Sequence, residues 1–321
     1  MKALVIRKYG GTDVLEHTEV PTPKVGPGQV LIKVEAASVN PIDWRIRKGE
    51  MKFFVRAKFP ITLGAEVSGE ISEVGSGVSR FKVGDKVFSL VPGDVGGFAE
   101  YVCVPEEAAA ARPATLDAVQ AASVPVGAIT ALQSLRDKGE LKAGQRVLVN
   151  GASGGVGLFA VQLAKELGAV VTAVCSEAKF ELVRSAGATE CLDYKKADFT
   201  TLGKRWDLIF DAAASKKFAD CRKALEPHGI YVTTIGGGGD MIMPAFNVFR
   251  SQKGRFIIAK PSSGDLTYIG GLLDTGKLKT VVGHVFPMAK MADAQDLSES
   301  GKSSGKIVIT LTPASAAAPP S

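Results

Sequence analysis

The stretch Val147-Leu148-Val149-Asn150-Gly151-Ala152-Ser153-Gly154-Gly155-Val156-Gly157 decides the fold of this chain. An apolar run over residues 146–150 predicts a buried strand, and a glycine-rich turn and an amphipathic helix ending near Leu167 follow it. Glycine lets the backbone approach a pyrophosphate closely, and the start of a helix offers free amides at the positive end of the helix dipole. The spacing Gly151-x-x-Gly154-x-x-Gly157 is a variant of the dinucleotide fingerprint, so it predicts nucleotide binding. The alternative is a tight turn without a ligand.

The end of the next strand, predicted over residues 170–175, indicates which nucleotide binds. Enzymes that use NAD usually carry Asp or Glu there for the ribose hydroxyls, whereas a 2′-phosphate needs cationic or hydroxyl donors. This strand runs into Ser176, Lys179 follows shortly after, and Tyr194 ends the strand after it. Glu177 is the nearby acid, and we expect it to point into solvent. The pattern favours NADPH, with a solvent-facing helix lysine as the alternative for Lys179.

Strands and helices alternate from about residue 124 onward. Further strands are predicted at residues 190–192, 208–211, 230–235 and 255–259, with helices at 178–186 and 216–225. Each parallel strand needs a crossover connection, and right-handed crossovers favour a doubly wound sheet. We therefore expect an α/β nucleotide-binding domain over residues 125–265.

The first 124 residues have a different sequence pattern, in which short runs rich in β-branched residues are separated by glycine. Strands predicted at 2–6, 30–36, 67–74, 86–90 and 98–104 suggest a small, mostly antiparallel barrel or sandwich. The segment after residue 265 returns to this pattern, so we expect residues 1–124 and 266–312 to form one domain. The tail 313–321 holds only Pro, Ala and Ser, a composition that predicts disorder.

Composition argues against several classes of protein. The 321 residues carry a net charge of +6, and this mild basic excess is spread along the chain. The four cysteines and three histidines are scattered, which argues against a disulfide scaffold and against a metal site built from Cys and His. We expect the cysteines to be small apolar fillers. No signal peptide is expected, and no run approaches the roughly 20 apolar residues that span a bilayer.

Several further stretches resemble the medium-chain dehydrogenase/reductase superfamily. With the glycine turn they cover the chain to about Leu311, and they read Val39-Asn40-Pro41-Ile42-Asp43-Trp44, Leu63-Gly64-Ala65-Glu66-Val67-Ser68-Gly69, Glu73-Val74-Gly75-Ser76-Gly77-Val78, Phe81-Lys82-Val83-Gly84-Asp85-Lys86-Val87, Gly96-Gly97-Phe98-Ala99-Glu100-Tyr101 and Gly305-Lys306-Ile307-Val308. Within the superfamily the chain is similar to the zinc-independent quinone oxidoreductase branch, which includes plant chloroplast-envelope members that reduce enones. The resemblance implies a GroES-like, mostly-β catalytic domain and a Rossmann domain.

Departures from the zinc alcohol dehydrogenases bear on the chemistry. Those enzymes carry a Cys ligand in the segment that here spans residues 38–43, and a Gly-His-Glu that here reads Gly64-Ala65-Glu66. Their four-cysteine lobe is also missing. We therefore expect no metal, and without a Lewis acid alcohol oxidation is disfavoured. The chemistry that the resemblance leaves is hydride transfer from NADPH to a quinone or to the activated C=C of an α,β-unsaturated carbonyl.

The resemblance also implies which residues form the site. Asn40 would lie near the nicotinamide and polarise a carbonyl, although a turn-capping role is its alternative, and Trp44 and Arg45 follow on the same loop. Related quinone reductases carry a tyrosine near the position of Arg45. Asp43 is expected to be structural. The expected cofactor-binding residues are Asn40, Thr130, Ser153, Gly154, Gly155, Val156, Ser176, Lys179, Tyr194, Ile235 and Gly236.

Two other classes of function remain open. One is an enoyl-thioester reductase, for which no basic patch is evident, and the other is a non-enzymatic protein that binds NADPH and RNA. A basic charge alone says nothing specific about nucleic acid, so we do not expect nucleic acid as a partner. Relatives are commonly dimers, which favours a homodimer. A cytoplasmic location is expected, with an organelle or peripheral membrane association as alternatives.

Overall fold

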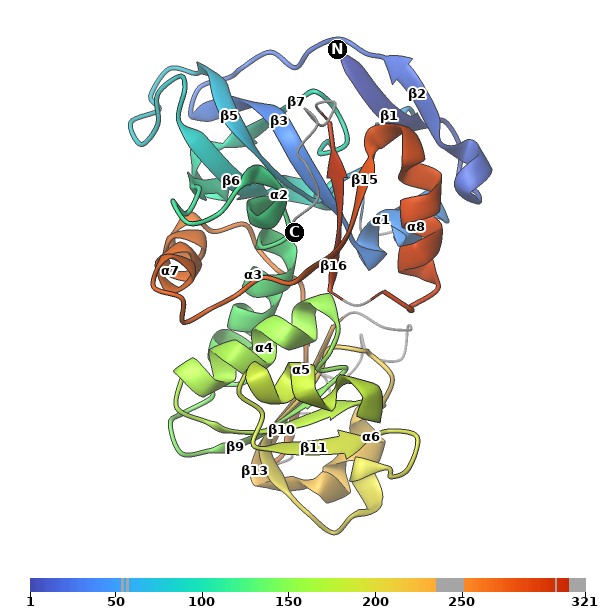
Figure 1. The fold of residues 1–321 in the computed structure, drawn as a ribbon, viewed down its shortest axis with the longest axis vertical. Helices are drawn as coiled ribbons and strands as arrows, with labels where there is room; N and C mark the ends of the chain where they lie inside the picture. Colours follow the sequence, from blue (N-terminus) through green and yellow to red (C-terminus); the bar gives the residue numbers. More distant parts are fainter. Residues whose placement is uncertain (53–54, 56–57, 235–250, 304, 312–321) are drawn as a thin grey trace, which may run out of the picture. The chain divides into compact units, whose positions relative to one another are not determined.

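The structure, a computed structural model, describes residues 1–321 except 53–54, 56–57, 235–250, 304 and 312–321. The chain forms two compact units (Figure 1). Unit 1 comprises Met1–Val126, Lys260–Gly276 and Thr280–Ser321, and unit 2 comprises Gly127–Ala259 and Lys277–Lys279. The predicted tail at residues 313–321 and the predicted cofactor residues Ile235 and Gly236 lie outside the described residues.

Unit 2 is built on a six-stranded sheet in which every neighbouring pair of strands is parallel. In spatial order its strands are β11 (Glu190–Asp193), β10 (Val170–Cys175), β9 (Arg146–Asn150), β12 (Trp206–Asp211), β13 (Leu225–Thr234) and β14 (Lys253–Ile257). The strand order reverses between β9 and β12, and sheets of this kind bind ligands at the carboxyl ends of the strands where the order reverses. The topology confirms the predicted Rossmann-type sheet.

The central strands of this sheet are apolar on both faces. Val147, Leu148 and Val149 on β9 are fully buried, as are Ile209 and Phe210 on β12. Parallel strands covered on both faces have such continuous apolar runs, and each fully buried side chain of this size contributes about 1.5–3 kcal/mol. This burial explains why the predicted bounds of β9 and β10 agree with the structure.

Helices connect the strands of unit 2. α3 (Pro125–Gln133) precedes β9, α4 (Gly155–Glu166) links β9 to β10, and α5 (Phe180–Ser185) links β10 to β11. A 3₁₀ turn at Glu177–Lys179 replaces the start of the helix predicted at 178–186. The helix predicted at 216–225 is shortened to α6 (Phe218–Cys221) with a further 3₁₀ turn, because β13 already begins at Leu225.

Unit 1 contains two sheets within the described residues. The larger joins β15 (Val282–Pro287), β16 (Lys306–Thr310), β3 (Gln29–Val39), β5 (Glu66–Val74), β6 (Lys86–Leu90) and β8 (Ala109–Ala111), with β7 (Tyr101–Pro105) also paired to β3. The smaller joins β2 (Glu16–Glu19), β1 (Lys2–Ile6) and β4 (Ile61–Thr62). All pairs except β15–β16 are antiparallel. This mostly antiparallel unit confirms the predicted GroES-like fold class.

The long strand β3 organises unit 1, because it pairs with β5, β7 and β16. In the β3–β16 ladder Val39 lies opposite Ile307, so the next residues, Asn40 and Lys306, follow on facing positions. The sheets are accompanied by the helices α1 (Pro41–Arg47), α2 (Ala118–Ala122), α7 (Ser263–Asp274) and α8 (Met291–Glu299). α1 directly follows β3 and packs beside α8 (Figure 1).

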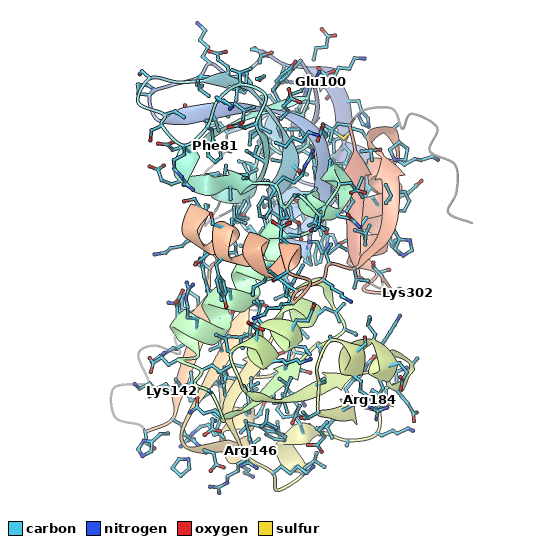
Figure 2. All side chains as sticks on the ribbon, turned by 60° about the vertical axis from the view of Figure 1, so that its left-hand side comes forward. Phe81, Glu100, Lys142, Arg146, Arg184 and Lys302 are labelled. Atoms are coloured by element: carbon cyan, nitrogen blue, oxygen red, sulfur yellow. The ribbon has the colours of Figure 1, made fainter. Side chains whose placement is uncertain are left out.

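Charged side chains cover the exterior of both units. Figure 2 shows Lys142, Arg146 and Arg184 at the outer surface of unit 2. Arg146 and Arg184 form exposed ion pairs with Glu226 and Glu181, and such pairs stabilise a protein by at most about 1 kcal/mol. Within the described part of the chain, no helix has both the length and the apolar character needed to cross a membrane.

Candidate functional site

The glycine turn between β9 and α4 forms a closely packed cradle of backbone groups in unit 2. Gly151 adopts a φ of 78°, and the N–H groups of Gly151 and Ala152 both donate to the carbonyl of Val174 on β10. A Cβ at Gly157 would lie 2.1 Å from the carbonyl oxygen of Gly151, so only glycine lets the helix pack this closely on the turn. The first amides of α4, those of Gly155 and Val156, have no acceptor within the helix and suit a phosphate.

A polar network lies where the strand order of unit 2 reverses. Asn150 ends β9 and Asp211 ends β12, and the Asn150 amide donates to Asp211 Oδ1 at 2.8 Å and to Ser215 Oγ at 2.9 Å. The hydroxyl of Tyr231 donates to Asp211 Oδ2 at 3.1 Å. Burial raises the pKa of Tyr231, so its proton is retained. Sequence analysis assigned no role to Asp211 or Tyr231, because nothing local shows that β9 and β12 are neighbours.

Three predicted adenosine-side residues lie at the adjacent ends of β10 and β11. Cys175 and Asp193 are neighbours in the β10–β11 register, so Ser176 and Tyr194 each follow directly from paired residues. Ser176 and Lys179 are joined by a 2.9 Å hydrogen bond between their backbones. Tyr194 is 60% exposed. Glu177 is exposed and pairs with Lys196 at 2.7 Å, so this acid faces solvent as expected.

The remaining predicted residues of unit 2 are placed as follows. Ser153 and Gly154 lie in the turn before α4, Ser153 half-buried and Gly154 exposed at the N-cap position. Thr130 lies in α3 and is 8% exposed. The structure therefore gathers Ser153, Gly154, Gly155 and Val156 in one turn.

In unit 1, Asn40 belongs to a buried polar cluster that forms where three strands meet. Its amide nitrogen donates to Glu66 Oε1 at 2.8 Å and to the Ser38 carbonyl at 3.1 Å, and its amide oxygen accepts from Lys306 Nζ at 2.5 Å. Lys306 also donates to Glu66 Oε1 at 2.7 Å. Both amide N–H groups of Asn40 are thus already used, so polarising a substrate carbonyl would require breaking one of these bonds.

Asp43 extends this cluster into α1. Its Oδ2 accepts from the Asn40 backbone N–H at 2.7 Å, whereas its buried Oδ1 has no partner in the described part of the chain. Burial raises the pKa of Asp43 well above its usual value, and the carboxylates of Asp94 and Glu66 raise it further. The hydrogen bond from the Asn40 backbone lowers this pKa, but by less than burial raises it. A neutral carboxyl costs less to bury without a partner than a carboxylate. Asp43 therefore has a structural role as the third residue of α1, whose carboxyl accepts from the N-cap residue Asn40, in agreement with the expectation from sequence.

Asp94, just after β6, is a strained neighbour of this cluster. It has a φ of 60°, in the left-handed region that non-glycine residues rarely adopt. Burial raises the pKa of Asp94 to about 6. Backbone strain and shifted carboxyl pKa values gather at functional sites, yet no sequence pattern pointed to this residue.

Trp44 and Arg45 lie on α1, one turn beyond Asn40. The Trp44 ring has two cations near it, since the Arg45 guanidinium and the Lys48 ammonium each lie 5.4 Å from its centroid. The Trp44 Nε1 atom is buried and has no hydrogen-bond partner within the described residues. An indole N–H can only donate, so this group is a donor without an acceptor. Arg45 lies 4.0 Å from Glu50.

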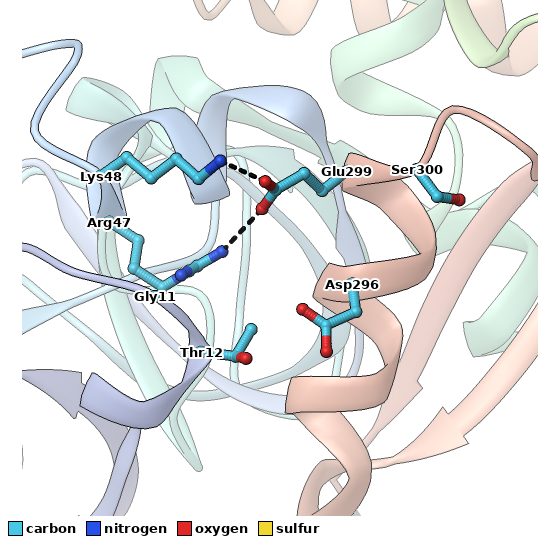
Figure 3. Close-up of a pocket in the computed structure, with 7 residues that line it drawn as sticks. All are labelled: Gly11, Thr12, Arg47, Lys48, Asp296, Glu299 and Ser300. Carbon is cyan, nitrogen blue, oxygen red and sulfur yellow. Dashed lines mark hydrogen bonds and ion pairs between the residues drawn. The ribbon is translucent and has the colours of Figure 1, made fainter.

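The far end of α1 is anchored through a buried arginine. Arg47 is 1% exposed, and its guanidinium donates to Gln295 Oε1 at 2.7 Å, to the Gly10 carbonyl at 2.9 Å and to Glu299 Oε2 at 3.1 Å. Lys48 also pairs with Glu299 (Figure 3). Arg47, Lys48 and Glu299 line a cavity of about 470 Å³, together with Gly11, Thr12, Asp296 and Ser300. Because Arg47 and Lys48 on α1 both pair with Glu299 on α8, these ion pairs join the two helices.

Comparison with known proteins identifies the family. The description "Alcohol dehydrogenase GroES-like domain" matches residues 26–114, and "Zinc-binding dehydrogenase" matches residues 186–309. The chain is 38% identical to the chloroplast envelope quinone oxidoreductase homolog of Arabidopsis thaliana, over 96% of this chain and 98% of that protein. The chain belongs to the quinone oxidoreductase branch of the medium-chain dehydrogenase/reductase superfamily.

Other members of the superfamily agree with this assignment. An Arabidopsis thaliana protein named NADPH-dependent alkenal/one oxidoreductase, chloroplastic, is 35% identical over 96% of this chain and 79% of its own length. The solved structure of the quinone oxidoreductase from Coxiella burnetii superposes with a TM-score of 0.89 at 31% identity and covers 97% of this chain and 99% of that one. The resemblance inferred from the sequence motifs is confirmed.

The residues of this superfamily member do not fit a zinc ion where the zinc dehydrogenases bind theirs. Ala65 offers no ligand atom, and both oxygens of Glu66 already accept hydrogen bonds, from Lys306 and Asn40 on one side and from the Val126 N–H on the other. The Lys306 ammonium would also repel a metal cation. Among the residues that the structure describes, no group of three or more His, Cys, Asp or Glu could hold a metal ion.

Proposed function

We propose that this chain is an NADPH-dependent oxidoreductase that reduces quinones or the activated C=C of α,β-unsaturated carbonyls. The observation that carries the proposal is the cofactor cradle: the first amides of α4, and Ser176 and Lys179 after β10, where the intervening Glu177 carboxylate faces solvent and pairs with Lys196. The printed names of its relatives support the same activity, since they include quinone oxidoreductase and NADPH-dependent alkenal/one oxidoreductase.

Unit 2 would hold the cofactor through residues of two kinds. Ser153, Gly155 and Val156 would donate to the pyrophosphate at the start of α4, and Gly154, whose own N–H donates to the Gly151 carbonyl at 3.0 Å, would only lie beside it. Ser176, Lys179 and Tyr194 would bind the adenosine 2′-phosphate at the ends of β10 and β11. When bound, NADPH would supply a hydride, which together with a proton from solvent would convert a quinone to a hydroquinone, or would add to the β-carbon of an enone to give an enolate that takes up a proton at its α-carbon.

On the substrate side, the Trp44 indole would donate to the oxygen that becomes negative during the reaction. Its Nε1–H is buried without an acceptor in the described part of the chain, and a preorganised donor of this kind stabilises a developing enolate without reorganisation. The cations of Arg45 and Lys48 polarise the ring and strengthen its N–H as a donor. Asn40 would act as part of the buried cluster rather than as the main hydrogen-bond donor to the substrate.

The activity is tested by following NADPH absorbance with a quinone, a short enal, a cyclic enone and an enoyl thioester, each repeated with NADH. We expect turnover of the quinone or the enones, and faster turnover with NADPH than with NADH. Turnover of the thioester alone would favour an enoyl-thioester reductase. If NADPH binds but no acceptor is reduced, the enzymatic function is wrong, and salt-dependent RNA binding that NADPH displaces would then favour the non-enzymatic alternative.

The role of Trp44 is tested with Trp44→Phe, which keeps the ring and removes the N–H. We expect kcat for the cyclic enone to fall about 100-fold, as when an oxyanion donor is lost, with KM for NADPH unchanged. The matched control is Trp206→Phe, because Trp206 Nε1 donates to Thr172 at 3.0 Å inside unit 2. That variant should be about 1 kcal/mol less stable and keep its kcat. A Trp44→Phe variant with wild-type kcat would show that another group stabilises the oxygen.

We also propose that the protein forms a homodimer and acts in the cytoplasm. Light scattering of the purified protein tests the first statement, and a monomer at micromolar concentration would contradict it. Both Arabidopsis thaliana relatives described above carry a chloroplast location in their names. Cell fractionation therefore tests the second statement, and enrichment with an organelle would contradict it.

A further inference from the structure

The buried ammonium of Lys306 forms an ion pair with Glu66 whose presence is not explained by a gain in stability. Lys306 is 6% exposed and Glu66 is fully buried, and the two form an ion pair of 2.7 Å. Replacing such a buried pair by apolar residues is often neutral or stabilising, because the desolvation of both charges offsets their attraction. A pair of this kind is therefore better explained by the geometry that it imposes on its neighbours.

The neighbour that both charges contact is Asn40. Lys306 can only donate, so the Asn40 amide oxygen must face it, and the ionised Glu66 can only accept, so the Asn40 amide nitrogen must face it. The reverse orientation of the amide would place its N–H groups against an ammonium and its oxygen against a carboxylate. The two charges thus select one of the two amide orientations of Asn40.

The carboxylate that makes this selection is itself fixed from outside the cluster. Glu66 Oε2 accepts from the Val126 backbone N–H at 2.7 Å, which leaves Oε1 for Lys306 and Asn40. Asn40 also holds the first turn of α1, because its backbone N–H donates to Asp43 in that turn. Strand β16, strand β5 and the start of α1 are in this way held in one arrangement.

We propose that Lys306 and Glu66 are positioning residues of the reductase site: together they fix the amide of Asn40 and the start of the helix that carries Trp44. The proposal rests on the proposed function, since it assigns these two residues a role in the same reaction. Neither side chain needs to contact the substrate. A displacement of a catalytic group by about 1 Å costs roughly 100-fold in rate, which is the size of effect that the pair can exert.

The test replaces the charged pair by a neutral one of similar size, Glu66→Gln with Lys306→Met. No charge is then left unpaired, so the double variant should fold. The introduced glutamine amide can both donate and accept, so it no longer dictates which way the Asn40 amide faces. We expect kcat for the cyclic enone to fall between about 10-fold and 100-fold, with KM for NADPH within about twofold of wild type. In the double variant, the further substitution Asn40→Ala should lower kcat by less than about twofold. In the wild-type protein, Asn40→Ala should lower kcat as much as the double substitution does.

A second ion pair of unit 1 gives the matched control. Arg112 and Glu35 lie 2.5 Å apart, and the Arg112 side chain is 8% exposed. Arg112→Met with Glu35→Gln should leave kcat unchanged. The proposal is overturned if the Glu66→Gln, Lys306→Met variant keeps wild-type kcat while folded, or if the control pair loses as much activity.

A measurement on the wild-type protein covers the case in which the double variant fails to fold. In a ¹⁵N-labelled sample, the Asn40 side-chain amide, assigned from its absence in Asn40→Ala, should show two well-separated and slowly exchanging protons. Rapid exchange with random-coil shifts would overturn the proposal. This measurement does not depend on turnover, so it separates a failure of the positioning role from a failure of the proposed function.

Discussion

Replacing Gly157 by alanine is the sharpest single test of the cofactor cradle. The added Cβ would lie 2.1 Å from the Gly151 carbonyl oxygen and 2.8 Å from Ala152 Cα. Real Cβ contacts essentially never fall below 3.0 Å, so the helix and the turn must separate by at least 0.9 Å. The obstructing atoms are backbone, so no side-chain rotation can relieve the contact.

The magnitude follows from two opposing effects. Overpacking costs about 1–3 kcal/mol, and a contact against backbone belongs at the upper end, about 3 kcal/mol. Alanine in place of glycine inside a helix gains about 1 kcal/mol. We therefore expect Gly157→Ala to lower the free energy of unfolding by about 2 kcal/mol. Because the amides of Gly155 and Val156 move with the turn, NADPH and NADH should both bind at least about tenfold more weakly.

The assay compares Gly157→Ala with Gly271→Ala by urea denaturation, together with cofactor titrations. Gly271 lies inside α7, and a Cβ there meets no atom within 4 Å. The same substitution should therefore stabilise unit 1 by about 1 kcal/mol and leave cofactor binding unchanged. If Gly157→Ala also stabilises the protein, or binds NADPH as tightly as wild type, the close packing of α4 on the glycine turn is refuted.

Three further predictions concern single side chains. Lys179→Ala should weaken NADPH at least about tenfold more than NADH in a fluorescence titration, because only NADPH carries the 2′-phosphate; equal losses would contradict that contact. Burial raises the pKa of Asp94 from 3.8 to about 6, so the folded state favours the protonated form and wild type loses stability, at most about 3 kcal/mol, as the pH rises from 4 to 7. The asparagine of Asp94→Asn cannot ionise, so this variant should be more stable than wild type at pH 7.5 but not at pH 4. Equal midpoints of urea denaturation for the two proteins at pH 7.5 would contradict this prediction. Arg47→Lys should lower the free energy of unfolding by about 2 kcal/mol, because one ammonium cannot reproduce the three bonds of the buried guanidinium; an unchanged midpoint would show that the anchor is dispensable.

Much of unit 2 was predictable from the sequence because its signals are local. The apolar runs of β9 and β10 and the glycine turn each lie within about a dozen residues, and their bounds agree with the structure. Helix ends were predicted less well, since the shortening of α6 depends on where β13 begins. In unit 1 the strands predicted at residues 2–6 and 86–90 have the bounds of β1 and β6, and the family motifs identified the GroES-like fold class.

Most of the polar contacts in unit 1 were not predictable. Glu66 and Lys306 both lie inside quoted motifs, but they are 240 residues apart along the chain. Nothing in either motif shows that one charge neutralises the other. No sequence pattern predicted the burial of Arg47 or the backbone strain at Asp94, because both depend on the residues that pack around them.

The sequence by itself determined the order of strands and helices in unit 2 and the position of its glycine turn, because hydrophobic period and glycine spacing are properties of neighbouring residues, and the resemblance of its motifs to known ones indicated the family. Only the tertiary structure decided how Asn40 is used. The antiparallel register of β16 on β3 places Lys306 opposite Asn40, and the pairing of β5 with β3 brings Glu66 to the same point. A hydrogen bond is set by distances of about 3 Å, and in a folded chain those distances depend on strand register rather than on separation in sequence.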